Sequence, residues 1–231
     1  MKIGLIGAMH DEIAALKNEM MITGTKTVAR MEFTEGSIGN TEVVAVQSGI
    51  GKVNAAICAQ ILIDHFGVTH IINSGIAGSL NNVLNIGDFV VSTDVVHHDF
   101  DTTVFGCQPG EVAQLGTASF PADEDLRTKI AAAIRQAAPD INMLEGRVAS
   151  GDQFISDAAR KQWIRDTFHA DCCEMEGSAI AQTAWINNVP FVIVRAISDK
   201  ADGSDLMDYI AFESAAARHS ADMLIAVLKQ F

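Results

Sequence analysis

Acidic side chains at the ends of apolar runs are the first candidates for chemistry in this sequence. Glu12 follows the run from Ile3 to Ile6 at the expected start of a helix, where the helix dipole alone would also favour a glutamate. Asp199 ends an apolar run interrupted by Arg195, and a role as an N-cap or turn residue is an equally good interpretation. Buried carboxyl groups in such places can act as general acid and general base.

Glu174 and Glu176 form a second acidic pair, on either side of Met175. In a helical segment the two carboxylates would point apart, whereas in an extended segment they would share one face. The sequence leaves both conformations open.

Glycine-rich turns follow two other apolar runs. The segment Ser48-Gly49-Ile50-Gly51-Lys52-Val53 is not a P-loop, because that motif needs Gly in place of Val46 and Ser or Thr in place of Val53. Gly75-Ile76-Ala77-Gly78 alone is a weak dinucleotide-binding signal. We interpret both segments either as tight turns or as places where glycine lets the backbone approach a sugar or a base.

Metal ligands and disulfides are not expected. His97 and His98 are adjacent, and adjacent residues of a strand point to opposite faces of the sheet, so they cannot easily share one ion. The cysteines have no C-x-x-C spacing, which predicts small buried thiols in a reducing compartment; they are Cys58, Cys107, Cys172 and Cys173.

The elements that must position these residues are short apolar runs alternating with segments of helical periodicity. Most of the runs are apolar on both alternations, as expected for strands covered on both faces. The expected strands are 3–6, 43–46, 70–72, 89–92, 147–149 and 191–196, and the expected helices are 53–65, 125–138, 156–168, 177–187 and 211–229. This alternation predicts an α/β fold, a three-layer α/β/α sandwich around a central mixed, largely parallel sheet, with ligands at the carboxyl ends of the strands.

Length and charge narrow the class of protein. The 231 residues contain no linker-like segment, so we expect one domain over residues 1–231. A formal net charge of -13 argues against nucleic acid and anionic membrane surfaces as partners. The start of the chain is expected to be a buried strand rather than a signal sequence, and no run is long enough to span a membrane; a cytoplasmic protein is therefore expected.

Five segments together resemble a known family, the 5′-methylthioadenosine/S-adenosylhomocysteine nucleosidases of the nucleoside phosphorylase superfamily. The resemblance covers essentially the whole chain, and the order and separation of the segments make it specific. The segments are Ile3-Gly4-Leu5-Ile6-Gly7-Ala8-Met9, Ser48-Gly49-Ile50-Gly51-Lys52-Val53, Ser150-Gly151-Asp152-Gln153-Phe154, Glu174-Met175-Glu176-Gly177 and Arg195-Ala196-Ile197-Ser198-Asp199.

The resemblance implies hydrolysis of the N-glycosidic bond of 5′-substituted adenine nucleosides without a cofactor. It assigns Glu12 as the general base that activates water and Asp199 as the general acid at adenine N7. Ser198 would orient Asp199. The implied substrate contacts are Glu176 and Met175 for the ribose, Phe154 and Ile155 for adenine, Ala77 and Gly78 beside the nucleoside, and Arg195 near the water. A homodimer is also implied, in which Phe105 covers the 5′ group bound in the partner's site.

Two departures from the family pattern are visible. Ile76 stands where close relatives often have a small hydroxyl residue, and Tyr209 stands where a Phe is usual near the 5′ end. Alternative interpretations are an aminofutalosine nucleosidase, a purine nucleoside phosphorylase on the same scaffold, and a non-catalytic nucleoside-binding protein. Retention of both Glu12 and Asp199 disfavours the last of these, because binding alone requires neither acid nor base.

Overall fold

The computed structural model describes residues 1–200 and 205–231, with the backbone alone for 205–211. Its strands are β1 (Lys2–Gly7), β2 (Met21–Val28), β3 (Met31–Ile38), β4 (Thr41–Gln47), β5 (His70–Ser79), β6 (Phe89–His97), β7 (Phe120–Pro121), β8 (Met143–Ser150), β9 (Cys172–Glu174) and β10 (Phe191–Asp199). Its helices are α1 (His10–Glu19), α2 (Lys52–Phe66), the short 3-10 helix η1 (Thr103–Phe105), α3 (Glu124–Ala137), α4 (Ala158–Phe168), α5 (Gly177–Ile186) and α6 (Asp205–Leu228).

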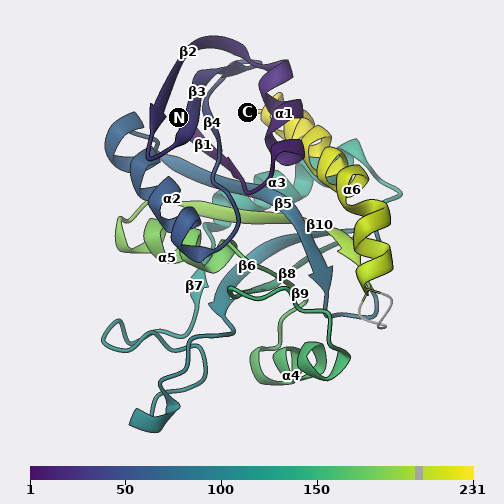
Figure 1. The fold of residues 1–231 in the computed structure, drawn as a ribbon. Coiled ribbons are helices and arrows are strands. Elements are labelled where there is room, and N and C mark those ends of the chain that lie inside the picture. Colours follow the sequence, from purple (N-terminus) through teal and green to yellow (C-terminus); the bar gives the residue numbers. More distant parts are fainter. Residues whose placement is uncertain (201–204) are drawn as a thin grey trace.

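The strands form one mixed sheet in the order β10-β6-β8-β9-β5-β1-β4-β3-β2, with β7 beside β6 (Figure 1). Parallel pairings connect β4, β1, β5 and β10, and the hairpin strands β2 and β3 add antiparallel pairings at one edge. Because β10 also pairs with β5, the strands β5, β10, β6, β8 and β9 close into a ring. The candidate acidic residues at the ends of β9 and β10 therefore belong to one closed unit.

Helices cover both faces of the sheet. Side chains of α1, α3 and α6 pack with the sheet in one apolar core, and those of α2 and α5 pack in a second core on the opposite face (Figure 1). The α/β class with helices on both faces confirms the predicted fold. A smaller third cluster, which includes Ile155, Ile164 and Phe168, attaches α4 near the ends of β8 and β9.

The predicted strands and helices all lie within or largely overlap the observed ones, but the β2–β3 hairpin was not predicted. Its turn residues Ala29 and Arg30 both have positive φ, of 50° and 64°. Such turns normally contain Asn or Gly, so the sequence carries no hairpin signal. Strand β2 is also mostly exposed, which removes the apolar pattern expected of a strand.

A long segment between β6 and β7 extends away from the body of the molecule and carries η1 (teal in Figure 1). Phe105, at the end of η1, is 82% exposed. No helix of the described residues is long and apolar enough to cross a bilayer.

Candidate active site

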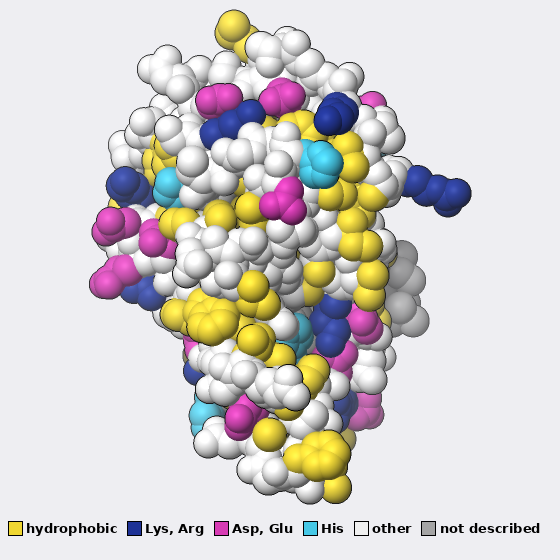
Figure 2. All heavy atoms as spheres, turned by 90° about the vertical axis from the view of Figure 1, so that its left-hand side faces the viewer, with side chains coloured by type: hydrophobic (Ala, Val, Ile, Leu, Met, Phe, Trp, Pro, Cys, Tyr) yellow, Lys and Arg dark blue, Asp and Glu magenta, His cyan; other side chains and the backbone are white. Residues whose placement is uncertain are grey.

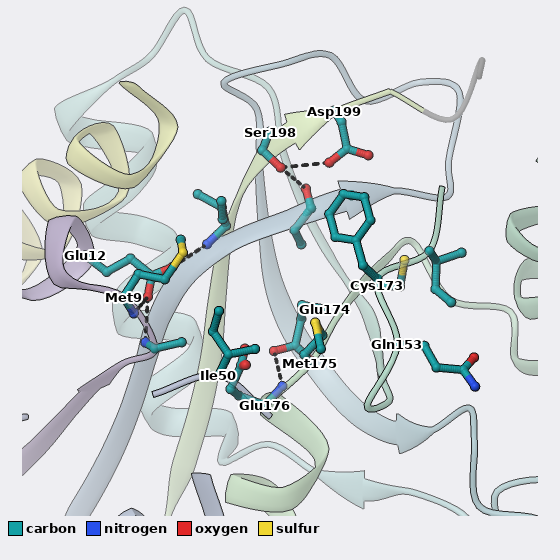
Figure 3. A pocket seen from close by; sticks show the side chains of 16 residues that line it. Met9, Glu12, Ile50, Gln153, Cys173, Glu174, Met175, Glu176, Ser198 and Asp199 are labelled. Carbon is teal, nitrogen blue, oxygen red and sulfur yellow. Dashed lines mark hydrogen bonds between the residues drawn. The ribbon is translucent and has the colours of Figure 1, made fainter. Parts of the chain in front are cut away.

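One pocket brings most of the predicted site residues together, at the carboxyl ends of β1, β5 and β10 (Figure 3). This position agrees with the expectation for ligands of α/β sheets. The lining residues are Ala8, Met9, Glu12, Ile50, Ile76, Ala77, Gly78, Gln153, Phe154, Ile155, Cys173, Glu174, Met175, Glu176, Ser198 and Asp199.

Glu12 is held in the pocket by backbone N–H groups. It lies in the first turn of α1 and is 3% exposed. Its Oε2 accepts hydrogen bonds from the N–H groups of Ala8 (2.6 Å) and Met9 (2.9 Å), and its Oε1 accepts one from Ile76 (3.2 Å). Burial raises the pKa of Glu12, although these N–H groups and Arg195 oppose that shift. A buried carboxylate with raised proton affinity suits a general base.

Asp199 stands on another side of the pocket, at the end of β10 (Figure 3). The pairing of β10 with β5 shifts register between Ile197 and Asp199, an irregularity of the kind that re-aims side chains next to active sites. Asp199 Oδ1 accepts a hydrogen bond from Ser198 Oγ at 2.8 Å, and Ser198 Oγ also lies 3.3 Å from the carbonyl oxygen of Ala77. The structure thus brings Ser198 against Asp199.

Two glycines of β5 make room for these carboxylates. A Cβ on Gly75 would lie 2.6 Å from Glu12 Oε1, and a Cβ on Gly78 would lie 2.8 Å from Asp199 Oδ2. Both distances are too short for any larger residue without displacing the carboxylate. Close approach is therefore the reason for glycine at both positions, and the approaching groups are the protein's own carboxylates.

Glu174, which lines the pocket, forms a buried ion pair with Arg195. Arg195 also donates to Asn73 Oδ1, and Glu174 accepts from Ser150 Oγ and from the N–H of Gly177 (2.8 Å). Burial alone would raise the pKa of Glu174, but the adjacent guanidinium lowers it; the pKa of Arg195 is raised by its acidic neighbours despite burial. Arg195 does not line the pocket. The structure therefore shows Arg195 in contact with Glu174 and Asn73, whereas its predicted position near the water stays a prediction.

Glu176 is the third acidic residue of this cluster. It is 7% exposed, and its Oε1 accepts a hydrogen bond from the N–H of Gly51 at 2.8 Å. Burial, together with the negative charge of Glu174, raises the pKa of Glu176 to about 7. The bond to Gly51 connects the glycine turn before α2 to the acidic segment before α5, which explains why both segments belong to one site.

Apolar side chains complete the pocket. Phe154 is 48% exposed, Ile155 is buried, and Met175 and Met9 present thioethers toward the same space (Figure 3). A flat ring and flexible sulfur-containing chains are suited to an aromatic base and a sugar.

Besides Arg195, one other described residue that was predicted to belong to the site is absent from the pocket lining. Phe105 lies in the extended segment and does not line it. The side chain of Tyr209 lies outside the described residues.

One buried residue was missed. Lys161 of α4 is 3% exposed, and its Nζ lies 3.0 Å from Asp199 Oδ2. Most positions around it in α4 are exposed, namely Ala158, Ala159, Gln162 and Trp163. A lysine in such a helix is expected to be solvated, so the sequence gives no indication that Lys161 is buried.

The histidines flanking this region are not arranged as metal ligands. Both ring nitrogens of His97 have side-chain partners, Ser178 Oγ at 2.7 Å and Gln182 Oε1 at 2.8 Å. The ring of His98 packs against Gly151, where a Cβ would lie 2.3 Å from it.

Comparison with known proteins agrees with this geometry. The family model of the phosphorylase superfamily matches residues 2–229. A 5′-methylthioadenosine/S-adenosylhomocysteine nucleosidase from Shewanella frigidimarina is 42% identical over 231 residues, covering 100% of both chains, and one from Geobacillus sp. is 41% identical, covering 99% of this chain and 98% of the relative. The chain belongs to this nucleosidase family within the phosphorylase superfamily.

Solved structures of the family have the same fold. A nucleosidase from Neisseria meningitidis in complex with methylthio-immucillin-A superimposes with a TM-score of 0.94 at 36% identity, covering 100% of this chain and 99% of the other. A futalosine hydrolase of Helicobacter pylori superimposes with a TM-score of 0.93 at 31% identity, covering 100% and 98%. The fold is therefore shared by enzymes with different nucleoside substrates.

Proposed function

We propose that the protein hydrolyses the N-glycosidic bond of 5′-substituted adenine nucleosides, releasing adenine and the 5′-substituted ribose. The observation that carries this proposal is one pocket that is lined by two buried carboxylates from different elements, Glu12 and Asp199. The ring of Phe154, which is 48% exposed, and two further carboxylates also line it.

In this mechanism Glu12 takes a proton from the attacking water. Three backbone N–H groups fix its orientation, while burial keeps its proton affinity high enough to accept that proton. As the bond from C1′ to the base breaks, the ribose takes on oxocarbenium character, and Glu176 accepts hydrogen bonds from its hydroxyls.

Asp199 supplies a proton to N7 of the leaving adenine. Adenine is a poor leaving group as an anion, so protonation as the bond breaks lowers the barrier. Phe154 stacks on the base, Ile155 contacts it through its backbone, and Ala77 and Gly78 lie alongside the nucleoside.

Water, rather than phosphate, is the proposed nucleophile. The described residues that line the pocket include four carboxylates and no lysine or arginine. Arg195, which is close to the acidic cluster, is paired with Glu174. A phosphate dianion next to Glu12 and Glu176 would meet uncompensated negative charge, which disfavours the phosphorylase alternative.

Steady-state kinetics test the proposal. Release of base would be followed with methylthioadenosine, S-adenosylhomocysteine, 5′-deoxyadenosine, aminofutalosine and inosine, with and without added phosphate. We expect adenine release that is independent of phosphate and little turnover of inosine. Phosphate-dependent release would support the phosphorylase alternative, and a strong preference for aminofutalosine would support the aminofutalosine nucleosidase alternative.

We also propose that the enzyme is a cytoplasmic homodimer in which each subunit covers its partner's pocket with Phe105. Exposed apolar side chains gather on the face formed by α2, α5 and the extended segment (Figure 2); they include Val53, Ile57, Val104, Phe105, Trp185 and Ile186. Exposed apolar side chains that gather on one face are typical of interaction surfaces, and a two-fold interface would bury them.

Subunit mixing tests this arrangement. Phe105→Ala and Glu12→Gln chains should each have low activity, and their mixture should regain part of it because one hybrid site is intact. The matched control mixes Glu12→Gln with a chain carrying both substitutions, which leaves no intact site. A fully active monomer in solution would exclude the proposal.

A further inference from the structure

Lys161 contacts the proposed acid from outside the pocket. Its Nζ lies 3.0 Å from Asp199 Oδ2 and 2.7 Å from the carbonyl oxygen of Lys200. Both side chains of the pair are 3% exposed, and Asp199 lines the pocket whereas Lys161 does not. The ammonium group is thus separated from the substrate site by the carboxylate.

Structural stability is a poor reason for this lysine. Removing an ammonium group from water is unfavourable, and a buried ion pair often does no more than offset that penalty. Helix α4 is already anchored without it, by the Asp157 N-cap (2.7 Å to the N–H of Arg160) and by Ile164 and Phe168 in an apolar cluster.

The charged groups of the neighbouring elements have other partners within the described residues. Arg165 donates to the carbonyl oxygen of Leu80 at 3.0 Å, Arg160 lies over the ring of Trp163 at 3.9 Å, Glu174 pairs with Arg195, and Asp171 accepts from Asn81 at 2.8 Å. Asp199 is the described carboxylate that Lys161 reaches, and Lys200 contributes its carbonyl oxygen.

The hydrogen bonds at Asp199 raise a question about its proton. Oδ1 accepts from Ser198 Oγ, and Oδ2 accepts from Lys161 Nζ. A general acid must deliver a proton and then regain one, so a proton donor in contact with Asp199 can supply the replacement. The lysine ammonium holds a proton within hydrogen-bond distance of that carboxylate.

We propose that Lys161 stores the proton that Asp199 delivers to the leaving base, so that lysine and aspartate work as one acid. This inference rests on the proposed role of Asp199. As the bond from C1′ to the base breaks, its electron pair passes to the base and a proton moves from Asp199 to N7. This transfer leaves Asp199 as a carboxylate, which takes a proton from Lys161 as an Nζ–H bond breaks and an Oδ2–H bond forms. The neutral amine regains a proton from solvent after product release, while Glu12 holds the proton taken from water.

The pH dependence separates this role from two alternatives. If Lys161 stores the proton, Asp199 in the wild type can take a proton from the lysine even at alkaline pH. Without the lysine, Asp199 must take that proton from solvent. If Lys161 merely stabilised the ionised carboxylate, its removal would favour protonated Asp199 and extend activity to higher pH. A structural role alone would lower the rate without changing the shape of the profile.

The experiment measures kcat/KM against pH from 5 to 10 for the wild type and for Lys161→Met, with methylthioadenosine as substrate. For Lys161→Met we expect the fall of kcat/KM on the alkaline side of the profile to occur about one pH unit or more lower than in the wild type. At alkaline pH this is about a tenfold loss, in addition to any loss that is the same at every pH. Arg160→Met is the matched control, because it removes one positive charge from the adjacent position of α4. An alkaline limb that moves up, or does not move, overturns the inference.

Lys161→Arg and a second substrate complete the test. Arginine keeps the positive charge but does not release its proton in this pH range, so we expect it not to restore the wild-type limb. A p-nitrophenyl riboside with the same 5′ group needs no acid, and both variants should cleave it at nearly the wild-type rate, which shows that they are folded. Normal adenine release by Asp199→Asn would refute the proposed function itself, whereas an impaired Asp199→Asn with an unshifted Lys161→Met refutes only the role of Lys161.

Discussion

The two sides of the pocket hold their carboxylates in different ways. On the base side, the donors to Glu12 are backbone N–H groups of Ala8, Met9 and Ile76. On the acid side, the donors to Asp199 include the side chains of Ser198 and Lys161. The first set of donors is fixed by the path of β1, α1 and β5, whereas the second depends on residue identity at two positions.

This difference suggests how the two halves of the reaction can vary. Substitutions near Glu12 change its surroundings but leave the backbone donors in place, so the environment of the base is robust. The environment of Asp199 can be changed by single substitutions at Ser198 or Lys161. We therefore expect the hydrogen bonds of Glu12 to survive nearby side-chain substitutions unless these push Glu12 away from its backbone donors, whereas hydrogen bonds of Asp199 are lost when Ser198 or Lys161 is replaced.

The strongest test of the comparison removes each carboxylate in turn. Glu12→Gln and Asp199→Asn should each lower kcat by about 10²–10⁴-fold with adenine nucleosides, because each removes one proton-transfer step. A riboside with a good leaving group should substantially rescue Asp199→Asn and hardly rescue Glu12→Gln. Equal rescue of both variants would show that the acid lies elsewhere.

A second test displaces each carboxylate by adding a methyl group at the glycine beside it. Gly75→Ala places a Cβ 2.6 Å from Glu12 Oε1, and Gly78→Ala places one 2.8 Å from Asp199 Oδ2. Misplacement of a reacting group by about 1 Å can cost roughly 10²-fold in rate. We expect Gly75→Ala to approach that loss and Gly78→Ala to cost less, because the backbone donors cannot follow Glu12 whereas side chains can follow Asp199. Gly24→Ala, with no atom within 4 Å of its Cβ, is the control for kcat.

A third test removes one side-chain donor on the acid side. A hydrogen bond to a charged group contributes about 1.5–3 kcal/mol, so Ser198→Ala should lower kcat by at least about tenfold if the bond orients Asp199 in the transition state. The p-nitrophenyl riboside should be cleaved normally by this variant. A loss that is equal for both substrates would mean that Ser198 supports the fold rather than the acid.

The last test measures stability rather than rate and concerns Glu176, whose pKa of about 7 results from burial and from the charge of Glu174. Because the folded protein retains this proton to higher pH than the unfolded chain, where the pKa is about 4.3, the free energy of unfolding falls as pH rises between these values. Glu176→Gln removes that dependence. Its stability relative to the wild type should increase by up to about 1.4 kcal/mol per pH unit across this window.

Urea denaturation at several pH values measures this difference. Glu42→Gln is the control, because that side chain is 63% exposed and should show no comparable trend. A difference between Glu176→Gln and the wild type that is constant with pH would contradict a raised pKa at Glu176.

Much of this site was predictable from sequence. Glu12, Asp199 and the segment Glu174-Met175-Glu176 are recognisable because they follow apolar runs in a family-like order, and the pocket gathers them. The two glutamates lie in neither of the two conformations that the sequence left open: β9 ends at Glu174, Met175 and Glu176 form a bend, and α5 begins at Gly177.

The parts that were not predicted depend on contacts between distant segments. The ring closure of β5 with β10 and β9 depends on long-range pairing, which leaves no local pattern. The ion pair between Lys161 and Asp199 joins residues 38 positions apart, so neither position alone indicates it. For the glycines of β5 the sequence left open a tight turn or a close approach to a sugar or base, and it could not show that the approaching groups are the protein's own carboxylates.

The strand β5 has a consequence for the evolution of substrate range. Gly75 lies against Glu12, the proposed general base, and Gly78 lies against Asp199, the proposed general acid. The two glycines are three residues apart in β5, which corresponds to about 10 Å of extended chain. The backbone of β5 is hydrogen-bonded to neighbouring strands on both sides, which restrains its position. It therefore keeps the distance between Glu12 and Asp199 constant. Loops such as the one carrying Phe154, and the extended segment carrying Phe105, can diverge around it without altering that spacing. Changes in preference among nucleosides can therefore accumulate at the periphery while the distance that the chemistry requires is inherited unchanged.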